Sequence, residues 1–456
     1  MLPDVALLEI FDFYVYKTWI EAWHTLVHVC RKWRGVVFGS PRRLNLRLYC
    51  GGRTPVRETL YVWPVLPIAI MIFVMGDNIV AALEQNDRIC ELASHELTSS
   101  EFEKVLAATQ QPFPALTHLR LWLREETTPV VPDSFLGGSA PQLQKLILDR
   151  IPFPGLPKLL LSATHLVYLD LQRIPHSGYI SPEAMVTCIS VLTSLKSLYI
   201  SFESPRSRPD RRSRRPPPPT RTLLPVLTEL TFKGVSEYLE DLLARIDAPL
   251  LDKSDITFFH QLIFDTPQLA QFISRTPKFK AHDQARVSFS NQFVRVALGG
   301  GLHLEISCQC RKSDWQLSSM AQICSSSFPR TLISMVERLS IREYLYEPWQ
   351  LEVDIENSQW LEFLHPFAAV KDLHISRIFT PSIAPALQEL SGERATEVLP
   401  ALQSLFLERY PSEYSRLVQE SIGQFVSARQ LAGHPIAVSR WELKLEVPVR
   451  KSLAVD

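Results

Sequence analysis

The sequence predicts an α/β protein in which N-terminal helices precede an irregular solenoid of alternating strands and helices with a curved parallel sheet. Three observations predict this fold class: two apolar helix-forming segments at the start, a short leucine pattern that recurs along most of the remaining chain, and proline or helix-capping residues at many boundaries. The 456 residues, 46% of them hydrophobic and 21% charged, can bury large cores over two or more domains.

The charge balance argues against partners that bind through a broad electrostatic field. Lys plus Arg and Asp plus Glu each total 48, so no net charge attracts nucleic acid or anionic lipid. The opening residues lack the basic and apolar regions of a signal peptide, and no Asn-x-Ser/Thr acceptor occurs. We therefore expect a cytoplasmic and/or nuclear protein, and we disfavour nucleic acid as its partner.

The cysteines do not suggest a disulfide framework, because they are odd in number and scattered over a long chain. We expect most of them to be small buried hydrophobic side chains. The seven positions are Cys30, Cys50, Cys90, Cys188, Cys308, Cys310 and Cys324.

One uncharged stretch, Leu60–Met75, has the composition of a membrane span. It is shorter than the roughly 20 residues that cross a bilayer, and two prolines interrupt it. Its β-branched end, Ile68–Val74, instead predicts a strand buried on both faces of a sheet. We expect no membrane contact.

The first helical segment runs from Leu2 to Tyr16. Pro3 suits a first helical turn, where its missing N–H costs nothing, and Asp4 favours the positive end of the helix dipole. Leu7, Leu8, Ile10 and Phe11 then form an apolar surface wider than one stripe.

The second segment, residues 23–38, has apolar residues at steps of three and four, which predicts that they share one helical face. Three valines lie off that stripe, so two short helices cannot bury every apolar side chain in each other. The apolar side chains that remain exposed would pack against either the domain that follows or a partner. The stripe consists of Trp23, Leu26, Cys30, Trp33 and Val37, and the valines are Val27, Val29 and Val36.

The order and spacing of these apolar residues resemble the F-box motif, and residues 39–68 resemble the segment that joins the F-box to the repeats in fungal F-box proteins. Val5 departs from the motif, because a second acidic residue is common at that position. The resemblance implies a three-helix F-box that docks on the Skp adaptor of a cullin-RING (SCF) ubiquitin ligase. The adaptor-binding residues would be Leu2, Pro3, Leu7, Leu8, Ile10, Phe11, Leu26, Val29, Cys30 and Trp33.

A pattern close to L-x-x-L-x-L recurs after these helices. Its clearest copies begin at Leu116, Leu143, Leu166 and Leu195, 23 to 29 residues apart. Leucine-rich repeats recur at about 20 to 29 residues. Each copy predicts a strand whose alternate residues enter a solenoid core, followed by a helix. Further degenerate copies are Leu227/Leu230/Phe232, Val336/Leu339/Ile341, Val370/Leu373/Ile375 and Leu402/Leu405/Leu407.

Helical patterns separate the strands. One of them starts with Ser181 as N-cap and Pro182 at the first helical position. The leucine pattern fades between Asp265 and Ser327, where residues 293–310 predict two strands around a glycine turn. This region is either a decayed repeat or an insertion.

No motif predicts catalysis, a cofactor or a metal. Gly299–Gly301 lacks the Lys-Ser/Thr pair of a phosphate-binding loop and predicts a turn. Cys308 and Cys310 lie near His303, but zinc sites need four ligands and usually use Cys-x2-Cys spacing. We expect a non-catalytic chain.

Residues 204–221 contain seven arginines, one aspartate and a run of four prolines. This composition cannot form a core, so we expect a disordered insertion that protrudes between two repeats. An import signal, a nucleic-acid contact and a proline-rich ligand are further interpretations.

Together these observations predict F-box helices over residues 1–48, a connecting segment over 49–66, a degenerate leucine-rich-repeat solenoid over 67–430 and a tail over 431–456. The chain would be the substrate receptor of an SCF ligase, with a target protein bound to the solenoid and the cullin reached through the Skp adaptor. The alternative is a leucine-rich interaction scaffold without a role in ubiquitin transfer.

Overall fold

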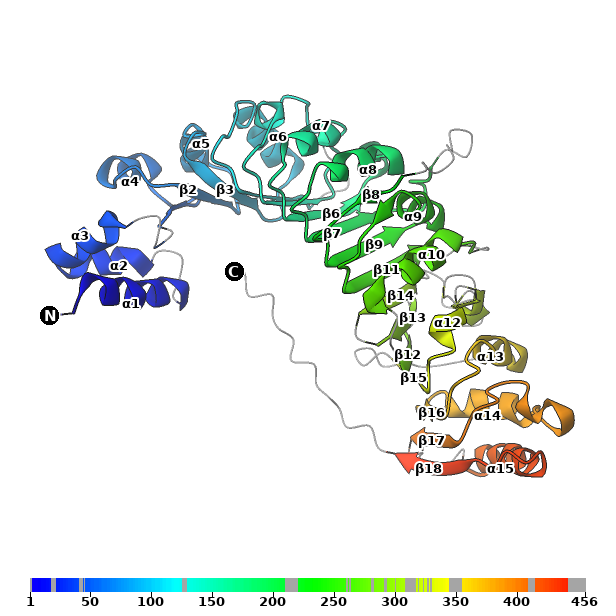
Figure 1. Ribbon diagram of the computed structural model, residues 1–456. Coiled ribbons are helices and arrows are strands. Elements are labelled where there is room, and N and C mark those ends of the chain that lie inside the picture. Colours follow the sequence, from blue (N-terminus) through cyan, green and yellow to red (C-terminus); the bar gives the residue numbers. More distant parts are fainter. Residues whose placement is uncertain are drawn as a thin grey trace. The chain divides into compact units, whose positions relative to one another are not determined.

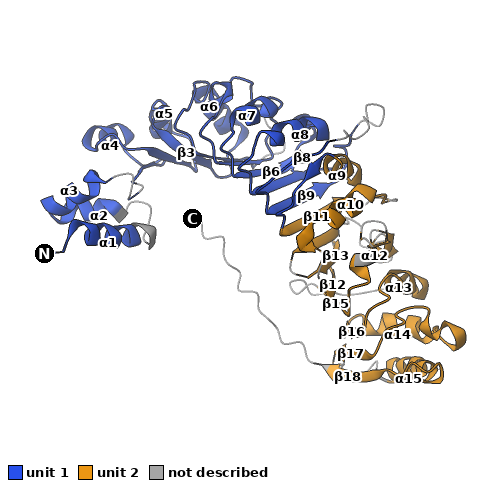
Figure 2. Cartoon of the chain, viewed as in Figure 1, with its two compact units in different colours: residues 1–234, 245–251 blue, residues 235–244, 252–456 orange. Residues whose placement is uncertain are grey.

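The computed structural model describes residues 2–17, 22–40, 44, 46–124, 129–209, 220–259, 261, 264–279, 283–290, 293–299, 301–307, 317–318, 320–322, 324–325, 328, 330–343, 355–408 and 415–441. The chain divides into two compact units (Figure 2). Unit 1 comprises residues 1–234 and 245–251, and unit 2 comprises residues 235–244 and 252–456. Within the described residues, no helix is both long enough and apolar enough to cross a membrane.

The N-terminal segment forms the helices α1 (Asp4–Lys17), α2 (Ala22–Val29) and α3 (Arg31–Gly39), as Figure 1 shows. The prediction that the stripe from Trp23 to Val37 lies on one face of a single helix is wrong, because the helix breaks at Cys30. Cys30 has extended backbone angles (φ −161°, ψ 169°), and its Sγ accepts a hydrogen bond from the backbone N–H of Trp33 at 3.5 Å. This side chain therefore caps a new helix where periodicity alone indicated a continuous one.

Unit 1 contains a sheet in which each neighbouring pair of strands runs parallel. Its helices lie along one face of the strands (Figure 1). The strands, in sheet order, are β1 (Leu48–Cys50), β2 (Ile68–Ile72), β3 (Ile89–Ser94), β4 (His118–Trp122), β5 (Lys145–Asp149), β6 (Tyr168–Ile174), β7 (Ser197–Phe202) and β9 (Glu229–Gly234). The connecting helices are α4 (Val56–Val62), α5 (Asp77–Leu83), α6 (Ser99–Ala108), η1 (Phe135–Gly138), α7 (Leu156–Ser162), η2 (His176–Gly178) and α8 (Pro182–Ser190).

The strand register confirms the leucine pattern in unit 1. The second position of the pattern aligns across the sheet from Leu119 through Leu146, Leu169 and Leu198 to Leu230. Each of these five side chains is at most 1% exposed. The third position of the pattern, two residues further along each strand, aligns in the same way. The repeats therefore stack in register and bury a continuous ladder of apolar side chains.

Local signals at the repeat boundaries are also confirmed. The Ser181 hydroxyl accepts a hydrogen bond from the backbone N–H of Ala184 at 3.2 Å, and Pro182 lies in the first turn of α8. A short parallel pair, β8 (Thr222–Leu223) with β10 (Ile246–Asp247), follows the arginine-proline segment. Residues 210–219 of that segment lie outside the described residues, whereas Ser207 is buried.

Unit 2 contains a mixed sheet. Its strands, in sheet order, are β11 (Lys253–Phe259), β14 (Leu302–Ser307), β13 (Phe293–Leu298), β12 (Gln284–Phe289), β15 (Arg338–Glu343), β16 (Asp372–Ile375), β17 (Ser404–Glu408) and β18 (Ala437–Trp441). Its described helices are α9 (Ser236–Leu243), α10 (Pro267–Arg275), η3 (Pro277–Phe279), α12 (Arg330–Ile333), α13 (Asn357–Leu364), α14 (Thr380–Gln388), η4 (Gly392–Thr396) and α15 (Ser415–Leu431).

The region in which the leucine pattern fades contains an antiparallel excursion. β13 runs antiparallel to both β12 and β14, whereas β14 pairs parallel with β11, and β12 with β15. The predicted pair of strands around a glycine turn is therefore confirmed. Gly301 is required at this turn, because a Cβ there would approach the backbone oxygen of Asp252 to 2.2 Å. Cys308 and Cys310 lie outside the described residues.

The strands extend beyond the predicted limits of the solenoid at both ends. β1 lies before residue 67 and pairs with β2, with Leu48 and Cys50 buried. β18 lies after residue 430 and pairs parallel with β17. Both strands lack the full leucine pattern, which explains why the pattern alone placed the boundaries further inward.

A buried arginine holds the last described helix of unit 2 against the preceding loop. The Arg429 side chain is 0% exposed. Its guanidinium donates to the backbone oxygens of Ala395 (3.1 Å), Pro400 (3.2 Å) and Leu402 (3.0 Å). Buried carbonyl groups need such donors, so this side chain satisfies the loop that leads into β17.

Replacing Leu169 by Ala should destabilise unit 1 by about 2 to 5 kcal/mol, because it leaves a cavity in the apolar ladder. Leu161→Ala is the matched control, since the Leu161 side chain is 46% exposed on α7. Urea unfolding of the full chain measures both changes. Equal stability of the two variants would show that the leucine ladder is not the core.

Arg429→Met should destabilise unit 2 by at least about 1 to 3 kcal/mol, because several buried carbonyl groups lose their donors. Arg416→Met on the exposed side of the same helix is the control. Chemical unfolding followed by hydrogen exchange at residues 395–402 checks this prediction. Unchanged protection of those amides would contradict it.

Candidate protein-interaction surfaces

The N-terminal helices share a small core. Leu7, Leu8 and Phe11 of α1 are buried, and the Phe11 ring lies 4.8 Å from that of Trp33 on α3. Leu26 of α2 is buried as well. The structure therefore assigns these side chains to packing between the helices.

The remaining residues of the predicted adaptor-binding set are accessible. Leu2, Pro3, Ile10, Val29 and Cys30 are exposed, and Trp33 is half-buried. The ten residues thus separate into four that pack the helices together and six that a partner can reach. The buried four shape the surface, and the accessible six supply part of it.

Two further side chains enlarge this surface. Val5 and Phe13 of α1 are 63% and 62% exposed, compared with 50% for Ile10. Sequence reasoning did not assign Phe13, although its spacing of three residues from Ile10 places both on neighbouring turns of one helix. We call the exposed apolar residues on and directly before α1, together with those at the turn between α2 and α3, the N-terminal apolar face; they are Leu2, Pro3, Val5, Ile10, Phe13, Val29 and Cys30.

The start of α1 lies beside the start of α3. Lys32 Nζ lies 3.2 Å from Asp4 Oδ1, and it donates to the backbone oxygen of Leu2 at 3.4 Å. The backbone N–H of Leu7 donates to the oxygen of Pro3 at 3.1 Å and begins the helix. These contacts bring Leu2 and Pro3 next to the turn that contains Cys30.

Aromatic contacts attach the helices to the first repeat. Trp23 Nε1 donates to the backbone oxygen of Arg47 at 3.0 Å, and the Trp23 ring lies 5.2 Å from that of Trp63 at the end of α4. The His24 ring stacks on Trp63 at 5.0 Å. The N-terminal apolar face is therefore presented on a fixed support.

The sheet face of unit 1 opposite the buried leucines carries polar and aromatic residues. Arg47 forms an ion pair with Glu91 at 2.5 Å, and Arg173 pairs with Asp149. The Lys145 ammonium lies 5.2 Å from the centre of the Tyr168 ring. Among the described residues of this face, the charges of Arg47 and Arg173 are thus neutralised locally by carboxylates.

Asp170 lies in the middle of this face and is 3% exposed. Its Oδ2 accepts hydrogen bonds from Tyr168 Oη (3.2 Å) and Gln172 Nε2 (2.9 Å), whereas its Oδ1 has no partner among the described residues. Burial raises the pKa of Asp170, and the two hydrogen bonds only partly offset this effect. Burial and the neighbouring Asp170 also raise the pKa of Tyr168 to about 12.

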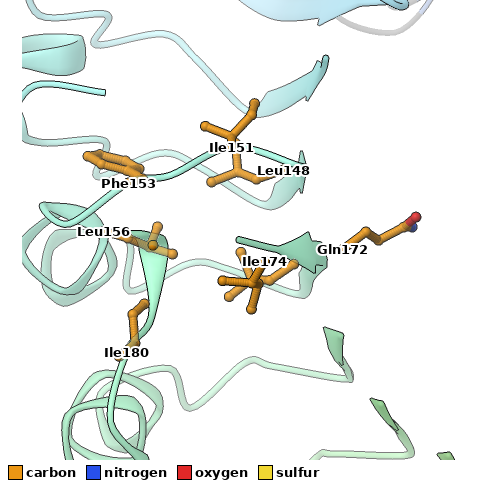
Figure 3. A pocket seen from close by; sticks show the side chains of 9 residues that line it. Leu148, Ile151, Phe153, Leu156, Gln172, Ile174 and Ile180 are labelled. Atoms are coloured by element: carbon orange, nitrogen blue, oxygen red, sulfur yellow. The ribbon is translucent and has the colours of Figure 1, made fainter. Parts of the chain in front are cut away.

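A small apolar cavity lies within unit 1 beneath this face (Figure 3). Leu148, Ile151, Phe153, Leu156 and Ile174 are among the residues that line it. Its volume of about 10 Å³ is close to the minimum that holds a single water molecule. It is therefore a packing gap between successive repeats and too small for an organic ligand.

Among the described residues, no three His, Cys, Asp or Glu side chains are grouped to hold a metal ion. His303, the residue considered with the two cysteines, lies 3.9 Å from Asp255. In the described part of unit 2, Arg295 binds Glu305 beside this pair at 2.7 Å. The cluster consists of polar contacts across neighbouring strands.

Comparisons with known proteins do not identify a family. No protein-family model matches the chain, and no curated protein matches its sequence. One similar solved structure is the leucine-rich repeat-containing protein LegL7 from Legionella pneumophila, which is 12% identical. The match covers 85% of this chain and 98% of that chain, with a TM-score of 0.25. A TM-score this low supports no inference, so the repeat architecture rests on the strand register.

Asp170→Asn should stabilise unit 1 at pH 8 and have a smaller effect at pH 4. The folded-state pKa of Asp170 is raised, so its protonated carboxyl stabilises the fold at low pH. This stabilisation is lost as the pH rises through that pKa, whereas the neutral amide of Asn does not ionise. Urea unfolding at both pH values, with the exposed Asp87→Asn as control, measures the difference. An equal effect of Asp170→Asn at both pH values would contradict the burial argument.

Proposed function

We propose that the chain is the substrate-recognition subunit of an SCF-type ubiquitin ligase. The observation that carries this proposal is the N-terminal apolar face, which keeps Leu2, Val5, Ile10, Phe13 and Val29 half-exposed or more on a small helical unit. Soluble chains rarely expose such a group of large apolar side chains to solvent unless they bind another surface. The resemblance of these helices to the F-box motif names that partner as the Skp adaptor.

The attachment of these helices to the repeats suits the same function. Trp23 and Trp63 fix the helices against the first repeat, and the repeats offer a long sheet face of paired charges and aromatic rings. Such a face fits a folded protein or a peptide better than a polyanion, because Arg47 and Arg173 are already paired with carboxylates. We propose that the target protein binds there.

The proposed contribution to ubiquitin transfer is proximity and orientation. The chain would hold its target at a fixed place relative to the cullin and the catalytic subunits, which converts a bimolecular encounter into an intramolecular one. No residue of this chain takes part in bond making under this proposal. We expect it to work in the cytoplasm and/or the nucleus.

The second candidate function is a leucine-rich interaction scaffold without a role in ubiquitin transfer. The in-register repeats support it as well as they support the first, because both functions use the repeats to bind a protein. The two proposals differ in what covers the N-terminal apolar face. Only the first requires the Skp adaptor.

Ile10→Asp should reduce binding of purified Skp adaptor by at least about tenfold, since a charge in an apolar interface loses its hydration. The Ile10 side chain is 50% exposed, so the helices should stay folded in the variant. Leu161→Asp on α7 is the matched control, and circular dichroism checks folding. Wild-type affinity in the Ile10 variant would exclude the SCF proposal and leave the scaffold.

A further inference from the structure

A second exposed apolar cluster spans the last turn of α4 and the segment that leads to β2. Tyr61, Val62 and Val65 are 91%, 68% and 83% exposed. No charged residue occurs from Leu60 to Leu66. We call Tyr61, Val62, Pro64 and Val65 the α4 patch. These three side chains are more exposed than the large apolar side chains of the N-terminal apolar face. An exposed apolar cluster of this kind indicates a binding surface.

The α4 patch is held in place at both ends. Val56, in the first turn of α4, is 0% exposed, and Leu66, directly after the patch, is 4% exposed. The backbone N–H of Trp63 donates to the oxygen of Thr59 at 3.1 Å and closes the helix. Pro64 then restricts its own backbone angle. The exposed side chains are thus presented by an anchored segment.

Trp63 links the α4 patch to α2. Its ring stacks on His24 with an interplanar angle of 13°, and it meets the His28 ring edge-on at 6.0 Å. Val29, the residue after His28, is 54% exposed and belongs to the N-terminal apolar face. Trp63 therefore holds the α4 patch beside the last turn of α2, which ends at Val29.

We propose that the adaptor bound to the N-terminal apolar face also covers the α4 patch, so that its interface extends to residues 61–65. This inference rests on the function proposed above. The contact of Trp63 with His28 supports the adaptor as occupant, since it holds the patch beside the helix end that carries Val29. The partner surface must be apolar, because the patch offers no charge to pair.

The test is a binding titration of purified Skp adaptor with the full chain. Replacing Tyr61, Val62 and Val65 together by Ser should weaken binding by about tenfold or more, because truncating an apolar cluster in an interface removes several contacts at once. The matched control replaces the exposed Val130 and Leu161 of unit 1 by Ser. These controls should bind with wild-type affinity, and all variants should keep their circular dichroism spectra.

The comparison with Ile10→Asp separates the two proposals. If Ile10→Asp abolishes binding and the triple variant binds like the wild type, the α4 patch is not part of the interface, although the SCF function stands. If the wild-type chain does not bind the adaptor, both proposals fall. If sedimentation shows self-association that only the triple variant loses, with unchanged adaptor affinity, the occupant is a second copy and the inference is wrong.

Discussion

The fold of unit 1 depends on the in-register stacking of its repeat leucines. Leu119, Leu146, Leu169 and Leu198 occupy one line across neighbouring strands, and a single repeat could not bury its own leucines. Because side chains alternate along a strand, a slip of one residue would turn a whole strand's leucines to solvent. The ladder therefore also determines which residues face the other way, including Tyr168 and Asp170. The candidate target surface is a direct consequence of the core register.

The N-terminal helices, unlike the repeats, leave part of their apolar surface exposed. They are too short to bury all their apolar side chains, so Phe11 and Leu26 pack inside while Ile10, Phe13 and Val29 remain at the surface. The contact between Trp23 and Trp63 packs these helices directly against the first repeat. A receptor that holds its target in a defined orientation needs such a fixed connection between its two binding surfaces.

Sequence patterns predicted the features that repeat and missed those that depend on single contacts. The leucine register and the Ser181 cap follow from periodicity and local hydrogen bonding, and both are present. The helix break at Cys30 was missed because the apolar residues continue at helical spacing on both sides of it, and periodicity does not show that Cys30 caps a new helix. Arg429 was missed because an arginine on a helix is ordinarily solvated, and only the folded loop shows the carbonyl groups that it binds. The contact of Trp63 with α2 joins distant parts of the sequence and leaves no local signal.

The central claim is that the N-terminal apolar face is the surface through which this chain joins a ubiquitin ligase. Hydrogen–deuterium exchange of the full chain, with and without purified Skp adaptor, tests it most directly because it locates the contact. The account predicts slower exchange at the start of α1 and around the turn between α2 and α3, with no change in the strands β4–β7. Slower exchange confined to those strands, or no change anywhere at saturating adaptor, would contradict it.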